Sequence, residues 1–411
     1  MSKANNKFWK QMIALTPENL RIPERRIDIP MVDNKEFRIN LIERIEAVTL
    51  KIIKQISTGQ SPQISYSSGR NITIESSLRE DVSPGCSSDL QDTISYNSLF
   101  DLESEEQEEE FSQNSRKTTV NFAVKRSRDK FVLMILIMSE VHHLLLTNTT
   151  KTKRSFYYDL KNDITGSLVS DQKYVDRALN DVANLLKCAP WDLRLLATAK
   201  GLVAGNMTIT LDDNQVIDCT IPGGAQIPLI TSNVTAICVK AEFVLIIEKD
   251  AVFQKLLEEN CPRILNCILV TGKGYPDVAT RMLVKMLSEK INLPVYIVVD
   301  ADPFGVDIML TYRFGSSTLY KESESLVCPN VRWLGIHPSE LIYLQVKTIP
   351  LTKADLIKLK SIEARTYINE TISKQLSILR KGKAEIEAVA FLKNFFTATY
   401  LPNKIDSQDY I

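Results

Sequence analysis

The 411-residue chain is poor in the residues on which many active sites depend. It has only three histidines, His142, His143 and His337. No HExxH sequence occurs, which excludes that metalloprotease motif, and so few histidines argue against a histidine-based triad. The seven cysteines are odd in number and have no CxxC spacing, which fits neither a disulfide framework nor a zinc site.

Long apolar segments are also lacking. The longest strongly apolar run, FVLMILIM at 131–138, is far shorter than the roughly 20 residues that a membrane-spanning helix needs. The first residues, MSKANNKFWK, are polar and charged, so we expect no signal peptide. These features predict a protein of a reducing intracellular compartment that has no membrane partner.

Charge is balanced over the whole chain but segregated along it. The 50 basic and 50 acidic residues give a formal net charge of zero. Residues 101–110, DLESEEQEEE, contain seven acids, whereas residues 116–161 contain ten Lys or Arg and three acids, a net charge of +7. Such a basic region suits a polyanion such as nucleic acid, and a solvated surface is the alternative interpretation.

The length predicts two or three domains, and the first half of the chain divides at changes of composition. In residues 1–58 we expect an amphipathic helix at 35–57, because Ile42, Ile45, Val48, Ile52 and Ile56 recur at helical spacing. Residues 59–115 are rich in Ser, Asn, Gly and acids, which predicts a disordered linker. The helix must therefore dock either on the main body or on a partner protein.

The rest of the chain predicts a multidomain α/β protein. Residues 116–235 resemble a winged-helix domain, a helix-turn-helix variant in which the strand-like segments MTITL and VIDCTI would form the β-hairpin wing. Residues 236–411 alternate helices with uniformly apolar strands such as FVLII and VYIVV. That pattern is typical of a parallel sheet covered on both faces.

Three carboxylates follow the predicted strands of this second domain. Glu248 follows FVLII, and Asp300 and Asp302 follow VYIVV. Ligands of parallel sheets bind at the carboxyl ends of the strands, and clustered carboxylates call for a hard cation such as Mg²⁺. The alternative is that Asp302 caps a helix and Glu248 pairs with Lys249. TGKG at 271–274 is a glycine-rich turn that suits a phosphate but is too short for a P-loop.

Several motifs resemble one family. IIEKDAVFQKLL, VTGKGYPDVATRMLVKML and VVDADPFGVDIML are similar to the Toprim domain of the A subunit of type VI (type IIB) DNA topoisomerases. They resemble even more closely its eukaryotic relative, the meiotic transesterase that makes DNA double-strand breaks. TKRSFYY, LLATAKGLVAGN and VRWLGIHPSE match the same family in the right order, so the resemblance extends from about residue 116 to the late YLPNK segment.

The resemblance implies a winged-helix domain that carries the catalytic tyrosine, followed by a Toprim domain. The nucleophile would be Tyr158, the second tyrosine of TKRSFYY, which would form a 5′-phosphotyrosyl link to DNA. A phenol with a pKa of about 10 is a weak nucleophile, and Arg154, four residues earlier, would favour the phenolate if this segment is helical. The implied Mg²⁺ ligands are Glu248, Asp300 and Asp302.

The resemblance also implies partners. Double-stranded DNA would contact Lys153, Lys200 and Lys273, and a homodimer would share its active sites between protomers. A topoisomerase VI B-like subunit would bind through the N-terminal helix, and the protein would act in the nucleus, on chromosomes. One departure is Ser155, which stands where many relatives have an acid after the motif arginine.

The sequence leaves three alternatives open. The chain could be a type VI topoisomerase A subunit that religates DNA together with an ATPase B subunit. It could be a Toprim nuclease or primase, which would act on DNA without a covalent adduct. It could also be a DNA-binding scaffold without catalysis, although Tyr158 and all three acids are present.

Overall fold

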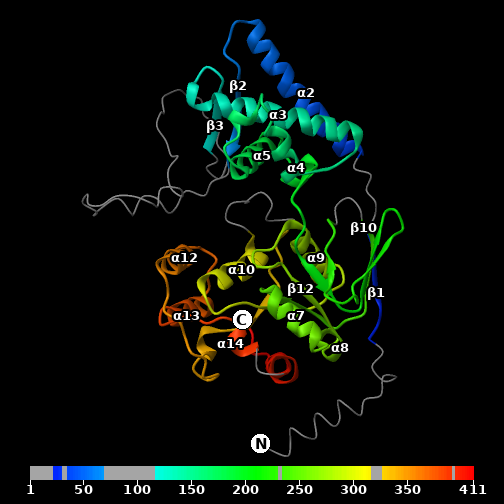
Figure 1. Cartoon of the computed structure of the whole chain (residues 1–411), viewed down its shortest axis with the longest axis vertical. Helices are drawn as coiled ribbons and strands as arrows, with labels where there is room; N and C mark the ends of the chain where they lie inside the picture. The colour runs from blue at the N-terminus through cyan, green and yellow to red at the C-terminus, as the bar shows by residue number, and fades with distance from the viewer. Residues whose placement is uncertain (1–21, 30–34, 69–115, 230–233, 316–325, 391–393) are drawn as a thin grey trace, which may run out of the picture.

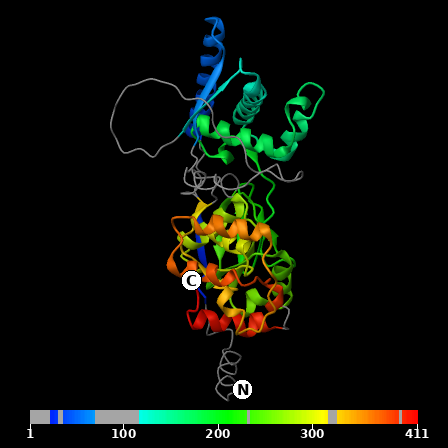
Figure 2. The same ribbon diagram turned by 90° about the vertical axis from the view of Figure 1, so that its left-hand side faces the viewer.

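The protein has two lobes stacked along its long axis, as Figures 1 and 2 show. The computed structural model describes residues 22–29, 35–68, 116–229, 234–315, 326–390 and 394–411. The first described strand, β1 (Arg25–Asp28), belongs to one lobe, α2 (Lys35–Ser57) belongs to the other, and the chain later returns to the first. We call the lobe that contains α2 the upper lobe and the other the lower lobe.

The upper lobe is built around two packed helices, α3 (Lys125–Thr147) and α5 (Gln172–Leu186). By length and composition alone, α3 could cross a membrane, but eight of its residues are buried in the core of this lobe. We therefore interpret α3 as a core helix. The smaller elements of this lobe are β2 (Gln63–Ser68), β3 (Arg116–Asn121), β4 (Lys151–Thr152), α4 (Lys153–Leu160) and β5 (Leu195–Leu196).

Part of the predicted linker is folded. β2 lies within 59–115 and pairs antiparallel with β3, so the prediction of disorder is wrong for residues 63–68. The alternation in QISYSS buries Ile64 and Tyr66, but this strand is short and finds its partner only after a long insertion. Residues 69–115 of the predicted linker lie outside the described residues.

Most of the predicted apolar stripe of α2 docks on the main body, whereas Ile56 at its end is 59% exposed. Leu41, Ile45 and Ile52 are buried in the core that α3 and α5 form. Our expectation that this stripe binds a partner protein is therefore wrong for these side chains. A different face of α2 remains exposed and carries Leu50 and Ile53, which are 65% and 55% exposed.

The lower lobe contains the predicted parallel sheet. Its six strands lie in the order β14-β13-β11-β12-β6-β9, in which the first four are parallel and β6 and β9 are antiparallel to their neighbours. The strands are β6 (Leu202–Ala204), β9 (Ala225–Gln226), β11 (Phe243–Ile247), β12 (Cys267–Thr271), β13 (Val295–Val298) and β14 (Val331–Gly335).

Helices cover both faces of this sheet, which explains its uniformly apolar strands. Alternate residues of β11 belong to two cores: Val244 and Ile246 face one, and Leu245 and Ile247 face the other. The first core includes α9 (Val278–Glu289), α10 (Pro303–Phe314), α12 (Lys353–Glu363) and α13 (Glu370–Leu379). The second includes α7 (Asp250–Glu258), α8 (Cys261–Ile264), α14 (Glu387–Ala390), the π-helix Phe396–Tyr400 and α15 (Leu401–Asp406).

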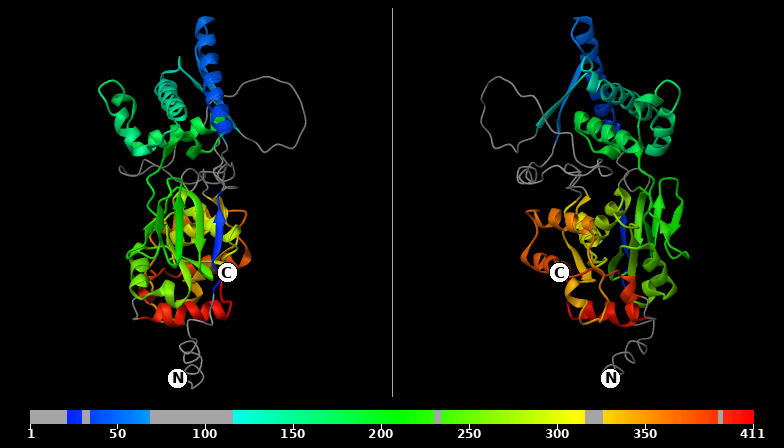
Figure 3. Two further views of the ribbon diagram at one scale, coloured as in Figure 1. Left: turned by 90° about the vertical axis from the view of Figure 1, so that its right-hand side faces the viewer. Right: turned by 60° about the vertical axis from the view of Figure 1, so that its left-hand side comes forward.

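The predicted wing belongs to the lower lobe. β7 (Met207–Leu211) and β8 (Val216–Asp218) do form a hairpin, but it joins β10 (Val234–Val239) and β1 in a four-stranded sheet, seen in Figure 3. Its buried side chains Met207 and Ile209 pack into the core of the lower lobe. The predicted domain boundary at residue 235 is therefore misplaced, because the chain already re-enters the lower lobe at β6. A hairpin has the same local sequence pattern in either lobe, and only its long-range pairing with β10 shows that it belongs to the lower lobe.

Candidate active site

The two tyrosines lie on α4, a short helix at the surface of the upper lobe. Thr152 begins the helix, and its side-chain oxygen accepts a hydrogen bond from the backbone N–H of Ser155 at 3.0 Å. Arg154 and Tyr158 are one turn apart, and Nη2 of Arg154 donates to the Tyr158 hydroxyl at 3.4 Å. The predicted proximity of this pair is confirmed, and the Tyr158 side chain is 58% exposed.

Tyr157 has a different environment. It is half-buried and packs against the core of the upper lobe. Its ring meets the ring of Tyr158 edge to face, with centroids 5.5 Å apart. Adjacent helical residues point in different directions, so one tyrosine anchors the helix while the other faces solvent.

Two of the predicted metal ligands meet at the carboxyl ends of neighbouring parallel strands. Glu248 directly follows β11, and Asp300 lies just beyond β13. The backbone N–H of Asp300 donates to Oε2 of Glu248 at 2.8 Å. The two residues are only 9% and 5% exposed. The sequence-based expectation that these acids gather at one edge of the sheet is confirmed.

Asp302 caps α10. Its Oδ1 accepts a hydrogen bond from the backbone N–H of Gly305 at 2.7 Å, which is the capping role considered from the sequence. A carboxylate has a second oxygen, so capping is compatible with a ligand role. Gly305 is required here because a Cβ atom would lie 2.4 Å from the carbonyl oxygen of Asp300. A glycine thus allows α10 to begin against the loop at 299–302, which carries Asp300 and Asp302 and which we call the acidic loop.

The electrostatics of this edge favour a cation. Burial raises the pKa of Glu248, and the negative charge of Asp300 raises it further. Burial also raises the pKa of Asp300, against the opposing effects of the Ile386 amide and Lys249, and it raises the pKa of Asp302. A bound divalent cation would offset these costs, and carboxylate oxygens are the donors that Mg²⁺ prefers. The residues present therefore fit such an ion.

A late segment of the chain completes this edge, and sequence reasoning missed it. Ala384 and Ala301 exchange two backbone hydrogen bonds of 3.1 and 2.9 Å, so residues 383–386 lie beside the acidic loop. The backbone N–H of Ile386 donates to Oδ1 of Asp300 at 2.8 Å. Oδ2 of Asp300 pairs with Lys249, whose Nζ atom is 3.0 Å away. Both oxygens of Asp300 are thus held in place.

Two predicted DNA-contacting lysines lie together near the carboxylates. Nζ of Lys200 donates to the carbonyl oxygen of Lys273 at 3.2 Å, and both residues are exposed. Lys273 lies in the TGKG turn, where the backbone N–H of Gly274 donates to the carbonyl oxygen of Glu248 at 2.9 Å. Lys153, the third predicted lysine, begins α4 in the upper lobe and is half-buried.

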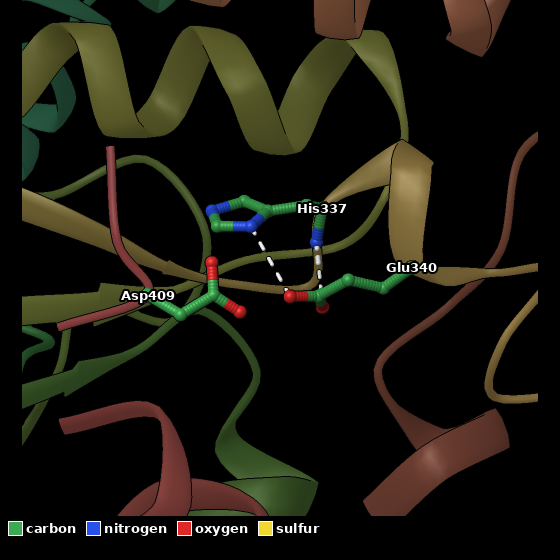
Figure 4. Close-up of side chains that lie close together, drawn as sticks. All are labelled: His337, Glu340 and Asp409. Carbon is green, nitrogen blue, oxygen red and sulfur yellow. Dashed lines mark hydrogen bonds and ion pairs between the residues drawn. The ribbon is translucent and has the colours of Figure 1, made fainter. Parts of the chain in front are cut away.

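A second polar cluster, drawn in Figure 4, has ligand-like spacing but already contains a cation. Potential ligand atoms of His337, Glu340 and Asp409 lie within 4.8 Å of one another. Nζ of Lys404 contacts all three, at 3.2 Å from His337 Nδ1, 3.2 Å from Asp409 Oδ2, and in hydrogen-bond contact with Glu340. The ammonium supplies the positive charge that a metal would bring, so we place no ion here.

The tyrosine and the carboxylates belong to different lobes. Tyr158 lies on α4 in the upper lobe, and Glu248 and Asp300 lie at the sheet edge of the lower lobe. Within the part of the chain that the structure describes, no hydrogen bond or ion pair joins Tyr158 to these acids.

Comparison with known proteins identifies the family. A family profile for the Toprim domain that Spo11 shares with the A-type subunit of topoisomerase 6 matches residues 243–405, and a second, "Type IIB DNA topoisomerase", matches residues 129–195. The human meiotic recombination protein SPO11 is 41% identical over 292 residues, which cover 68% of this chain and 72% of the relative. The chain belongs to the Spo11/topoisomerase 6 family.

Both meiotic recombination proteins and topoisomerase 6 subunits are among the similar proteins. The Drosophila melanogaster meiotic recombination protein W68 is 39% identical over 292 residues, covering 70% of this chain and 86% of the relative. The A-type subunit of DNA topoisomerase 6 from Arabidopsis thaliana is 34% identical over 307 residues, covering 72% and 70%. The family match assigns a Toprim domain to the lower lobe, and its profile begins at the first residue of β11.

Proposed function

We propose that the protein is a DNA transesterase that makes meiotic double-strand breaks and so initiates recombination. The observation that carries this proposal is the exposed Tyr158 hydroxyl hydrogen-bonded to Arg154, in a chain whose other lobe gathers buried carboxylates at a sheet edge. The names of the meiotic relatives favour this role over a religating topoisomerase. A religating topoisomerase is the alternative, because the Arabidopsis relative is a subunit of DNA topoisomerase 6.

In the proposed reaction, the Tyr158 oxygen attacks a backbone phosphate. A phosphotyrosyl bond forms at the 5′ end, the bond to the 3′ oxygen breaks, and that oxygen leaves as a 3′-hydroxyl after taking up a proton. Arg154 donates a hydrogen bond to the Tyr158 hydroxyl, and its guanidinium would also pair with a phosphate oxygen. Glu248, Asp300 and Asp302 would hold Mg²⁺, which when bound would supply positive charge to offset the negative charge that develops in the reaction.

The proposed DNA-binding surface uses both lobes. We assign the upper lobe, including α4, as the DNA-binding domain, with Lys153 on the same helix as the proposed nucleophile. Lys200 and Lys273 would contact phosphates near the carboxylates, because both are exposed, Lys273 lies in the TGKG turn and Lys200 contacts it. DNA binding would then bring the two lobes' contributions together.

The proposed assembly is a homodimer in which the nucleophile of one protomer meets the carboxylates of the other. Two observations support it: the two halves of the site lie on different lobes, and a double-strand break needs two nucleophiles. For a topoisomerase VI B-like partner, the face of α2 that carries Leu50 and Ile53 is the proposed contact, since its other face is buried. Chromosomal DNA as substrate implies action in the nucleus.

A direct experiment is to incubate the purified dimer, with its partner, with Mg²⁺ and radiolabelled duplex DNA, then denature and digest the mixture. A labelled nucleotide that stays on the protein, and that maps by mass spectrometry to the peptide containing Tyr158, supports transesterification. Cleaved DNA without any protein-bound label would instead favour the Toprim nuclease alternative. Label attached at a different residue would contradict the assignment of the nucleophile.

A further inference from the structure

The ammonium group of Lys249 lies among three carboxylates at the edge of the sheet. Its Nζ atom is 3.0 Å from Oδ2 of Asp300, 2.8 Å from Oε2 of Glu387 and 3.3 Å from Oε2 of Glu385. The side chains of Lys249 and Glu387 are 26% and 22% exposed, whereas that of Glu385 is 63% exposed. Lys249 is therefore shared chiefly between one candidate ligand, Asp300, and one acid outside the ligand set, Glu387.

The backbone holds this arrangement in place. Lys249 directly follows Glu248, and Glu387 is the first residue of α14. The segment before α14 is fixed to the acidic loop through Ala384 and through the Ile386 amide, which donates to Asp300. A lysine side chain is ordinarily an ammonium at neutral pH, and here its Nζ atom has three carboxylates within salt-bridge distance.

We propose that Lys249 competes with the metal for Asp300, and that Glu387 sets the strength of this competition by holding the ammonium. In the metal-free protein, Lys249 neutralises part of the charge at Asp300. On Mg²⁺ binding, the ammonium shifts away from Asp300 onto Glu387 and Glu385, because two cations at one carboxylate repel each other. This inference rests on the proposed Mg²⁺ site and assigns Lys249 and Glu387 as positioning residues.

The proposal predicts opposite effects for two substitutions. Lys249→Met removes the competing cation, so Mg²⁺ affinity should rise about tenfold. Glu387→Gln leaves Lys249 with fewer partners and more firmly on Asp300, so affinity should fall about tenfold. In the double variant Lys249→Met/Glu387→Gln, the effect of the Glu387 change should shrink to about threefold or less, because its route through Lys249 is gone.

The measurement is isothermal titration of Mg²⁺ into the full-length protein, without DNA, at constant pH and ionic strength. Asp300→Asn is the control for the metal site, because it alters a proposed ligand and should weaken Mg²⁺ binding. Lys374→Met and Glu370→Gln are matched charge controls, since they alter an exposed ion pair of 2.8 Å on α13 and should leave affinity unchanged. Circular dichroism and thermal unfolding of each variant check that it is folded.

Failure of the proposed metal site and failure of the proposed competition by Lys249 would give different results. If the wild type binds no Mg²⁺, or Asp300→Asn binds it as well as the wild type does, the metal site is wrong and the inference goes with it. If Asp300→Asn loses affinity while Lys249→Met binds no more tightly, only the competition is refuted. Glu387→Gln tests it with Lys249 intact, and an unchanged affinity for that variant overturns the proposal even if Lys249→Met does not fold.

Discussion

Nη2 of Arg154 lies 3.4 Å from the hydroxyl oxygen of Tyr158, one helical turn away on α4. The cation and the proposed nucleophile are therefore brought together by a single short helix. Tyr157, next in sequence, is instead engaged in packing. The two tyrosines should consequently respond differently to the same substitution.

Tyr158→Phe should abolish covalent attachment to DNA, because only the proposed nucleophilic oxygen is removed, and it should leave DNA affinity and thermal stability unchanged. Tyr157→Phe is the matched control and should retain activity. Arg154→Gln should slow attachment by about 100- to 1000-fold, the range typical for loss of one electrostatic contact in an active site. The readout is protein-bound label after denaturation. An active Tyr158→Phe with an inactive Tyr157→Phe would reverse the assignment within the pair.

The two faces of α2 should separate stability from partner binding. Ile45→Asp puts an unpaired charge into the core of the upper lobe, so it should lower the free energy of unfolding by about 3 kcal/mol or more. Ile53→Asp, on the exposed face, should leave stability within about 0.5 kcal/mol. If that face is the partner contact, Ile53→Asp should also lose the B-like subunit in a pull-down. Loss of stability in Ile53→Asp would show that this face is also buried.

His337 should make the stability of the lower lobe dependent on pH. Its Nε2 lies 2.9 Å from the carbonyl oxygen of Trp333, so Nε2 carries the proton and donates, while Nδ1 accepts from Lys404. Burial, followed by the charge of Lys404, lowers the pKa of His337 to about 4. The unfolded chain, with a histidine pKa near 6.5, therefore binds a proton that the folded protein does not bind between these values.

The stability that His337 contributes therefore decreases as the pH is lowered. Stability from His337 is fully present above pH of about 6.5 and is lost as the pH falls towards 4, by about 3 kcal/mol for the full shift. Thermal unfolding at pH 7.5 and 5.0 measures it, with His143→Gln as the surface control, since His143 is exposed. His337→Gln should flatten the dependence between pH 6.5 and 5. An unchanged slope would mean that His337 is protonated in the folded protein.

Local patterns predicted the elements of the site, but not how distant segments complete it. The spacing of Arg154 and Tyr158 and the uniformly apolar β11 are local signals, and each gave the right geometry. The hairpin β7–β8 was recognised but assigned to the wrong lobe, because its partner β10 is a long-range contact. The ion pair between Lys249 and Glu387 joins residues 138 positions apart, and the charge pattern of KAEIEA alone gives no partner.

Because the tyrosine and the carboxylates lie on different lobes, it can be tested whether two protomers share each site. Tyr158 lies on the upper lobe and Asp300 on the lower, so a shared site would take the tyrosine from one protomer and the carboxylates from the other. An isolated monomer would then have both halves but no working site. Such an arrangement would restrict cleavage to assembled dimers.

Mixing two inactive proteins distinguishes shared sites from sites within one protomer. In a heterodimer of Tyr158→Phe and Asp300→Asn chains with shared sites, the intact tyrosine of one chain faces the intact carboxylates of the other, and the second site is doubly broken. Such heterodimers, isolated by two different affinity tags, should nick one strand of a supercoiled plasmid and not make a double-strand break. Each mutant homodimer is the control and should leave the plasmid uncut. If each site lay within one protomer, every site in the mixture would lack one essential residue, so verified heterodimers that never nick would rule out the shared site.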